Sequence, residues 1–187
     1  VQEHTKIPVL GHSEGICHVF VDEFADIKKA IDICFDAKCQ YPAACNSMET
    51  MLVHKNISKK FLPLIIKKFK RVNVEIRGDN LTRKIVSDIK NASEEDWSTE
   101  YNTLTLSVKV VNDLNEAITH INKYGSKHTD AIITEDKKNA SEFMEAVDSS
   151  SVMWNASTRF ADGFRYGKGA EVGISTAKIH SRGPVGL

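Results

Sequence analysis

The chain has 187 residues, which is enough for one domain with a substantial hydrophobic core. Hydrophobic residues make up 41% and charged residues 27%, as in folded globular proteins, which excludes a disordered or collagen-like chain. The 25 basic and 25 acidic residues cancel, so we expect neither nucleic acid nor an anionic membrane as a partner. No apolar run approaches the roughly 20 residues of a membrane span.

Apolar residues recur at helical spacing in four segments, which predicts helices over residues 25–37, 58–71, 113–123 and 140–147. Asp26 lies near the start of the first helix, and Ser58 is the expected cap of the second. Shorter apolar runs predict strands over residues 51–54, 106–111, 131–134 and 151–154.

Strand and helix therefore alternate along most of the chain. Such alternation predicts an α/β fold with a mostly parallel sheet covered by helices and with ligand sites at the carboxyl ends of the strands. Residues 84–99 give no clear period, so we expect a loop there, with one helical turn as the alternative. The chain opens with Val1 rather than Met and stops at a glycine-rich run, so we expect a fragment of a larger chain.

The four cysteines have neither Cys-x-x-Cys nor Cys–His spacing, so we expect no metal site. No secretory signal is apparent, and we expect reduced thiols. Cys17 and Cys34 lie in apolar patterns and are interpreted as small buried hydrophobes.

Cys45 differs from the other cysteines because it follows Tyr-Pro-Ala-Ala in a turn, and residues 46–50 are predicted to form a short helical turn. A thiol at a helix N-terminus has a lowered pKa and backbone donors for an oxyanion, so Cys45 is a candidate nucleophile. A structural cysteine in a turn is the alternative, since no base is paired with it in the sequence.

A second candidate site follows the last predicted strand, where Asn155, Ser157, Thr158 and Arg159 come in quick succession. The arginine fork and the hydroxyls could hold a carboxylate or phosphate, and an exposed polar turn is the alternative. Among the histidines we retain only His128, in a loop leading into a strand, and interpret the other six as surface or packing residues. The glycines of residues 167–173 are one position too widely spaced for a dinucleotide-binding loop.

Three long motifs resemble those of γ-glutamyl phosphate reductase, and together the resemblance covers nearly the whole chain. They are Tyr-Pro-Ala-Ala-Cys-Asn-x-Met-Glu-Thr-x-Leu-Val-His, His-Thr-Asp-Ala-Ile-Ile-Thr-Glu-Asp, and Asn-Ala-Ser-Thr-Arg-Phe-Ala-Asp-Gly-Phe-Arg-Tyr-Gly-x-Gly-Ala-Glu-Val-Gly-Ile-Ser-Thr. The resemblance implies an aldehyde-dehydrogenase-like fold. Residues 1–18 would be the carboxyl-terminal edge of a cofactor-binding domain, residues 19–160 a catalytic domain, and residues 161–187 a segment returning toward the cofactor domain.

The resemblance also implies a reaction of proline biosynthesis. Cys45 would attack γ-glutamyl phosphate, and the resulting thioester would accept hydride from NADPH to give glutamate-5-semialdehyde. Where aldehyde dehydrogenases carry a glutamate that activates water, this sequence has Val9, which suits a reductase because hydrolysis would waste the thioester. Glu100 falls where that superfamily has a glutamate contacting the nicotinamide ribose.

For the substrate, we hypothesise that Arg159 with Ser157 and Thr158 holds an anionic end, that Asn155 helps to orient it, and that His128 contributes. The main rivals are a non-catalytic assembly or interface module of a larger enzyme and an aldehyde-oxidising dehydrogenase. We expect a homo-oligomer.

Residues 11–18, Gly-His-Ser-Glu-Gly-Ile-Cys-His, and the form Pro-Ala-Ala-Cys-Asn resemble the reductase portion of the bifunctional animal and plant enzyme Δ1-pyrroline-5-carboxylate synthase. That parent would have a fused glutamate kinase domain upstream and a mitochondrial location. Otherwise a cytoplasmic location is expected.

Overall fold

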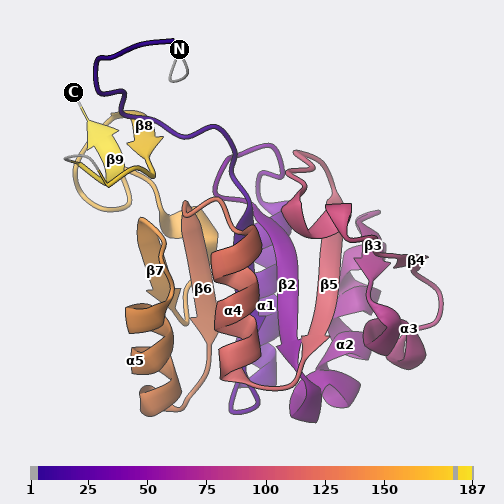
Figure 1. Ribbon diagram of the computed structural model, residues 1–187. Coiled ribbons are helices and arrows are strands. Elements are labelled where there is room, and N and C mark those ends of the chain that lie inside the picture. The colour runs from indigo at the N-terminus through magenta and orange to yellow at the C-terminus, as the bar shows by residue number, and fades with distance from the viewer. Residues whose placement is uncertain (1–3, 179–180, 187) are drawn as a thin grey trace.

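The computed structural model describes residues 4–178 and 181–186 (Figure 1). Its main sheet has seven strands in the order β4-β3-β5-β2-β1-β6-β7, and every neighbouring pair is parallel. The predicted α/β class is therefore confirmed. The strands are β1 (Cys17–Val21), β2 (Met48–His54), β3 (Glu75–Gly78), β4 (Lys90–Asn91), β5 (Thr105–Val111), β6 (Thr129–Ile133) and β7 (Ser151–Trp154).

Helices cover both faces of this sheet. They are α1 (Ile27–Cys39), α2 (Lys55–Lys70), α3 (Asn80–Ile85), α4 (Leu114–Tyr124) and α5 (Lys137–Ala146), with 3-10 turns η1 (Glu95–Ser98) and η2 (Thr158–Phe160). The strand pleat divides the core: Val19 and Val21 pack with α1 and α2, whereas Phe20 packs with α4 and α5. Figure 1 shows α4 and α5 in front of the sheet and α1 behind it. No helix in the described ranges combines the length and apolar character needed to cross a bilayer.

The last two strands, β8 (Glu171–Ser175) and β9 (Gly183–Gly186), form a separate antiparallel pair beside the main sheet (Figure 1). The separate treatment of residues 161–187 stays a prediction. The predicted boundary between residues 18 and 19, however, falls inside β1, because both Cys17 and His18 pair with neighbouring strands of the sheet. That residues 1–18 and 161–187 belong with a cofactor domain stays a prediction.

Two local predictions are corrected by the structure. Helix α2 begins before Ser58, and its cap is His54, whose Nδ1 accepts a hydrogen bond from Asn56 N at 3.1 Å. The expected loop over residues 84–99 also includes the end of α3 and the short strand β4, whereas the alternative of one helical turn is confirmed by η1. Strands β3 and β4 were missed because they are short: β3 has Ile76 as its one buried apolar side chain and β4 is exposed, so their conformation comes from pairing rather than from an apolar pattern.

Candidate active site

Cys45 is half-buried in a tight loop that leads into β2. Two backbone hydrogen bonds form the loop, from Ala44 N to Tyr41 O (3.2 Å) and from Ser47 N to Ala44 O (2.8 Å). The predicted helical turn after the thiol is wrong, because β2 begins directly after this loop. All side chains of residues 46–50 are buried, so packing and pairing with β1 decide the local conformation. No helix N-terminus follows the thiol.

The segment before β1 fixes the backbone of Cys45. The Cys17 Sγ donates a hydrogen bond to the Cys45 carbonyl oxygen at 3.3 Å. A Cβ placed on Gly15 would lie 2.2 Å from that same oxygen and 2.6 Å from Cys45 Cα. Glycine is therefore required at position 15 for the two backbone segments to lie so close together.

Two histidines from distant parts of the sequence meet the thiol. A ring nitrogen of His12, a ring nitrogen of His128 and the Cys45 Sγ all lie within 4.8 Å of one another. The two rings are in an edge-to-face arrangement with centroids 4.9 Å apart. His12 Nδ1 donates to the carbonyl oxygen of Ile174 in β8 (2.9 Å), which leaves Nε2 to accept a proton when the ring is neutral. The sequence interpretation of His12 as a surface or packing residue did not anticipate this position beside the thiol.

His128 is fully buried just before β6. Its Nδ1 lies 2.9 Å from Thr129 Oγ1, and its Nε2 has no hydrogen-bond partner within the described part of the chain. Burial, and next the charge of His12, lower the pKa of His128 to about 4. The ring is neutral at pH 7, so it cannot attract an anionic substrate by charge, and its predicted role in substrate binding stays a prediction.

The electrostatic environment of Cys45 opposes ionisation. Burial, followed by the negative charge of Glu171, raises the pKa of the thiol. The charge of Glu100 acts in the same direction, whereas the backbone N–H of Cys45 itself and the guanidinium of Arg159 lower it. The expected lowering of the thiol pKa is therefore wrong, since burial outweighs the donors that remain without a helix.

Arg159 lies on the same side of the molecule as the thiol. Its Nε donates to Gln40 Oε1 at 2.8 Å, and its Cζ lies 5.8 Å from the centre of the Tyr41 ring. Its two predicted neighbours in an anion cradle are less accessible. Ser157 is buried and its hydroxyl accepts from Arg159 N, which caps η2, while Thr158 is buried with its Oγ1 unpartnered in the described residues. A substrate contact by these hydroxyls stays a prediction.

Asn155 is not brought to the thiol. It follows the carboxyl end of β7, whereas Cys45 precedes the amino end of β2. Its Oδ1 accepts from Thr134 N (3.0 Å) and its Nδ2 donates to Thr134 O (2.9 Å). Both amide atoms hold the turn after β6, and the orientation of substrate by Asn155 stays a prediction.

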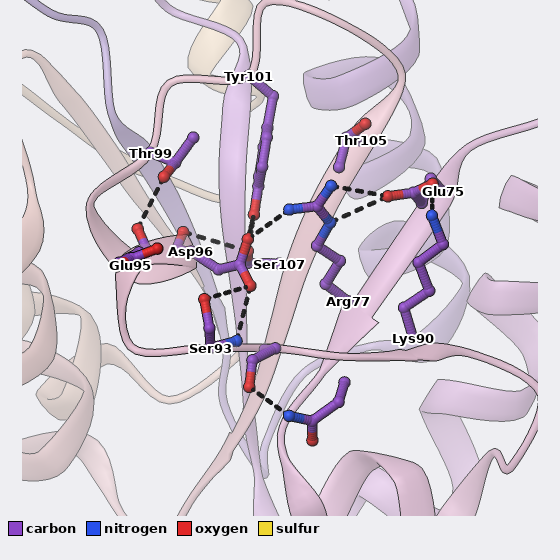
Figure 2. A network of polar contacts seen from close by, with 12 residues as sticks. Glu75, Arg77, Lys90, Ser93, Glu95, Asp96, Thr99, Tyr101, Thr105 and Ser107 are labelled. Carbon is purple, nitrogen blue, oxygen red and sulfur yellow. Dashed lines mark hydrogen bonds and ion pairs between the residues drawn. The ribbon is translucent and has the colours of Figure 1, made fainter.

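Glu100 lies on a segment that a polar network holds in place, shown in Figure 2. The carboxylate of Asp96 accepts hydrogen bonds from Tyr101 Oη (2.7 Å), Arg77 (2.7 Å) and the backbone N–H of Ser93 (2.7 Å). Burial alone would raise the pKa of Asp96, but these donors lower it to about 2. The network fixes both ends of the loop, so half-buried Glu100 is held where its charge acts on Cys45.

These groups gather at the amino ends of the parallel strands, where His12, Cys45, Glu100 and His128 precede β1, β2, β5 and β6. In Figure 1 this is the upper edge of the sheet, opposite the arrowheads of β2 and β6. The prediction of a site at the carboxyl ends is wrong. At the carboxyl edge, polar side chains that end or follow strands cap helices: His54, the last residue of β2, caps α2, Asp113 after β5 caps α4, and Asp136 after β6 caps α5.

The sequence and the structure of the chain were compared with those of known proteins. It is 60% identical over its whole length to γ-glutamyl phosphate reductase of Methanococcoides burtonii, and it covers 43% of that protein. The crystal structure of γ-glutamyl phosphate reductase from Thermotoga maritima matches with a TM-score of 0.97 at 48% identity, over all of this chain and 45% of the other. The chain is homologous to γ-glutamyl phosphate reductase. No family model matches it.

The stated resemblance to γ-glutamyl phosphate reductase is thus confirmed. The chain spans less than half the length of the curated relatives it matches. A propionaldehyde dehydrogenase from Clostridium phytofermentans matches with a TM-score of 0.68 at 16% identity, covering 94% of this chain and 48% of that one. The expected aldehyde-dehydrogenase-like fold is confirmed by this likeness.

Sequence reasoning about this γ-glutamyl phosphate reductase homologue missed three residues beside the thiol. His12 and Gly15 lie in a motif that carried the resemblance, but their contact with Cys45 depends on the course of the chain before β1. The glycine directly before a buried strand was the available signal for a close backbone approach. Glu171 reaches the site from β8, and no local pattern indicates that contact.

Proposed function

We propose that this chain carries the reacting thiol of an enzyme that reduces γ-glutamyl phosphate to glutamate-5-semialdehyde in proline biosynthesis. The observation that carries the proposal is the half-buried Cys45 Sγ within 4.8 Å of imidazole nitrogens of His12 and His128, in a chain homologous to γ-glutamyl phosphate reductase. A thiol beside a histidine is a recurrent arrangement for covalent catalysis on activated carbonyl groups.

His12 takes the proton of the thiol in this proposal. Because burial raises the pKa of Cys45, a base is needed for attack near neutral pH. The bond from His12 Nδ1 to the Ile174 carbonyl orients the ring and fixes the tautomer, so that Nε2 accepts the proton. The separation within 4.8 Å allows the proton to pass directly or through one water.

The covalent step then balances within the substrate and the thiol. The thiolate of Cys45 attacks the acyl carbon, the bond from that carbon to the phosphate oxygen breaks, and phosphate leaves with the electron pair. The product is a γ-glutamyl thioester on Cys45. The guanidinium of Arg159, whose charge already favours the thiolate, would hold an anionic group of the substrate.

A nicotinamide nucleotide, when bound, supplies the hydride that converts the thioester carbonyl to the aldehyde and frees the sulfur. Glu100 fits a contact with ribose hydroxyls because it is a half-buried carboxylate on the Cys45 side with no ion pair among residues 4–178 and 181–186. NADPH is the form that the family resemblance implies. A glycolyl-CoA reductase and a glyceraldehyde-3-phosphate dehydrogenase of the same fold were each solved with NADP.

The proposed enzyme would protect its thioester from water. Val9 provides no carboxylate base where the sequence aligns with the glutamate of aldehyde dehydrogenases. Release of free glutamate from the thioester faster than transfer to phosphate would instead support the aldehyde-oxidising alternative.

The experiment compares Cys45→Ser with Cys39→Ser in the full-length protein. Cys39 is the other half-buried thiol, at the end of α1, and serves as the matched control. Cys45→Ser should fold normally by circular dichroism and lose on the order of 10⁴-fold or more in phosphate-dependent oxidation of glutamate-5-semialdehyde, while Cys39→Ser keeps its activity. Retention of activity by Cys45→Ser would favour the assembly-module alternative.

The substrate contact is tested separately with Arg159→Ala and Arg159→Lys. Loss of the forked donor should raise the KM for the phosphorylated substrate, more in the alanine variant than in the lysine variant. An unchanged KM in both would remove Arg159 from the substrate site.

The bifunctional parent is part of this proposal and depends on the motif at residues 11–18. A glutamate kinase domain upstream of this chain in the full-length sequence would support it, and the mitochondrial location follows only with that parent. Sedimentation of the full-length protein tests the proposed homo-oligomer.

A further inference from the structure

Cys45, His12 and His128 together offer the side chains that zinc prefers. A thiolate and two imidazoles are typical zinc ligands, and their candidate ligand atoms already lie within 4.8 Å of one another. Zinc bonds of about 2.0–2.3 Å in a tetrahedral site place ligand atoms about 3.5 Å apart, so atoms within 4.8 Å of one another need to close by about 1 Å at most. His12 lies on a largely exposed segment before β1, where movement costs little packing, whereas Cys45 and His128 directly precede β2 and β6.

Both histidines already have the supporting contacts of metal ligands. Histidines that bind a metal through one nitrogen usually donate from the other to a carbonyl or a similar acceptor. His12 Nδ1 donates to Ile174 O at 2.9 Å, and His128 Nδ1 lies 2.9 Å from Thr129 Oγ1. The His128 Nε2 is buried and unpartnered in the described residues, although an unsatisfied polar atom is costly to bury. A metal ion would satisfy it.

The surrounding charges favour a cation on balance. Glu171 and Glu100 both act on Cys45 with negative charge, and Glu171 has the larger effect. The positive charge of Arg159 opposes them more weakly. Three protein ligands leave the fourth zinc position to a water or an anion.

We propose that Cys45, His12 and His128 bind Zn²⁺ and that the bound metal reversibly masks the thiol. On binding, the S–H bond of Cys45 breaks, the S–Zn bond forms and the proton goes to solvent, with no change of oxidation state. A zinc-bound sulfur cannot attack an acyl group at the same time, so zinc competes with the substrate. The competition between zinc and substrate rests on the proposed function, whereas the binding of zinc to the three side chains does not.

The test uses Co²⁺ as a spectroscopic probe on the full-length protein under anaerobic conditions. One equivalent should give a thiolate-to-cobalt charge-transfer band and the strong visible bands of tetrahedral cobalt, and Zn²⁺ should displace both. Cys45→Ser should remove the charge-transfer band, and His12→Gln should weaken binding about 10- to 100-fold or more. Cys39→Ser and His54→Asn are the controls that should bind as the unmodified protein does.

His12→Gln is the decisive histidine variant, because His128 is fully buried and its replacement can disturb folding. Absence of the charge-transfer band in the unmodified protein, or an unchanged spectrum in Cys45→Ser, overturns the zinc site. A cobalt spectrum as expected in a protein without reductase activity would overturn the proposed function and leave the zinc site standing.

Discussion

A Cβ atom added to Gly15 would lie 2.2 Å from the carbonyl oxygen of Cys45. Real Cβ atoms do not approach an oxygen so closely, so any other residue at position 15 must push the thiol loop away from the segment before β1. That same segment carries His12. The distance between the thiol and its proposed base therefore depends on a glycine that has no chemistry of its own.

Gly15→Ala should reduce the activity of the full-length enzyme about 10²-fold through a displacement on the order of 1 Å. It should also lower the free energy of unfolding by about 1–3 kcal/mol, because the obstructing atoms are backbone. Gly11→Ala is the matched control, since nothing lies within 4 Å of its added Cβ. Steady-state kinetics and urea unfolding measure both effects. If Gly15→Ala behaves like Gly11→Ala, the proposed close approach is incorrect.

The charges around Cys45 predict opposite effects of two substitutions on its alkylation. Because Glu171 raises the pKa of the thiol, Glu171→Gln should increase the rate of iodoacetamide labelling a few-fold at neutral pH. Because Arg159 lowers that pKa, Arg159→Gln should decrease the rate. In the unmodified protein and in both variants, the rate of Cys45 labelling should keep rising at pH values above the pKa of an ordinary thiol, because the pKa of Cys45 is raised. Peptide mass spectrometry reports the rates, with Cys39 as the internal control, and equal rates in the two variants would refute this electrostatic account.

The network around Asp96 should stabilise the loop that holds Glu100 (Figure 2). Asp96→Asn should lower the free energy of unfolding by about 2–3 kcal/mol, because hydrogen bonds to a charged group are lost. Since the pKa of Asp96 is lowered to about 2, its contribution is present above the ordinary carboxyl pKa and is lost as the pH falls toward 2. Urea unfolding at about pH 6 and about pH 3 should show a smaller pH effect in the variant. Glu95→Gln changes an exposed side chain of η1 and should leave the free energy of unfolding unchanged. An equal loss of stability in Asp96→Asn and Glu95→Gln would contradict the role given to Asp96.

A buried ion pair should make stability depend on pH in the opposite sense. Glu49 Oε2 accepts from Lys38 Nζ at 2.6 Å, and both side chains are buried. Burial raises the pKa of Glu49 from 4.5 to about 7 and lowers the pKa of Lys38. The folded state therefore binds the Glu49 proton more tightly than the unfolded chain does. The free energy of unfolding should decrease as the pH rises from 4.5 to about 7.

Glu49→Gln should lack this decrease when urea unfolding is compared at about pH 5 and about pH 7.5. Glu142→Gln, on the exposed side of α5, is the control that should keep the slope of the unmodified protein. An identical pH slope in Glu49→Gln and the unmodified chain would show that Glu49 is not the responsible group.

The parts of the fold that depend on local pattern were predictable from the sequence. Helix α1 follows from its apolar spacing, and Asp26 caps it by accepting from Lys29 N at 2.8 Å. Strand β7 has the predicted bounds. By contrast, residues 46–50 were predicted as helical, but they are buried, and from Met48 on they belong to β2, where pairing with β1 outweighs local propensity.

The candidate site was only partly predictable. The motif around Cys45 predicted the nucleophile. Its neighbours His12, His128 and Glu171 lie before β1, before β6 and in β8, and only the folded chain brings them together. Asn155 had the right chemistry for a ligand contact, yet its amide is needed to close the turn after β6. Spacing along the sequence also could not indicate the Cys45, His12 and His128 cluster, because its members come from three separate loops.

The central claim is that Cys45 carries the glutamyl group as a thioester. The most direct measurement incubates the full-length enzyme with labelled glutamate-5-semialdehyde and NADP⁺ in the absence of phosphate, stops the reaction rapidly with acid and maps the label on peptides. The account predicts label on the Cys45 peptide that neutral hydroxylamine releases, and none in Cys45→Ser. Label on another residue, or an active enzyme with no acid-stable label on Cys45, would contradict it.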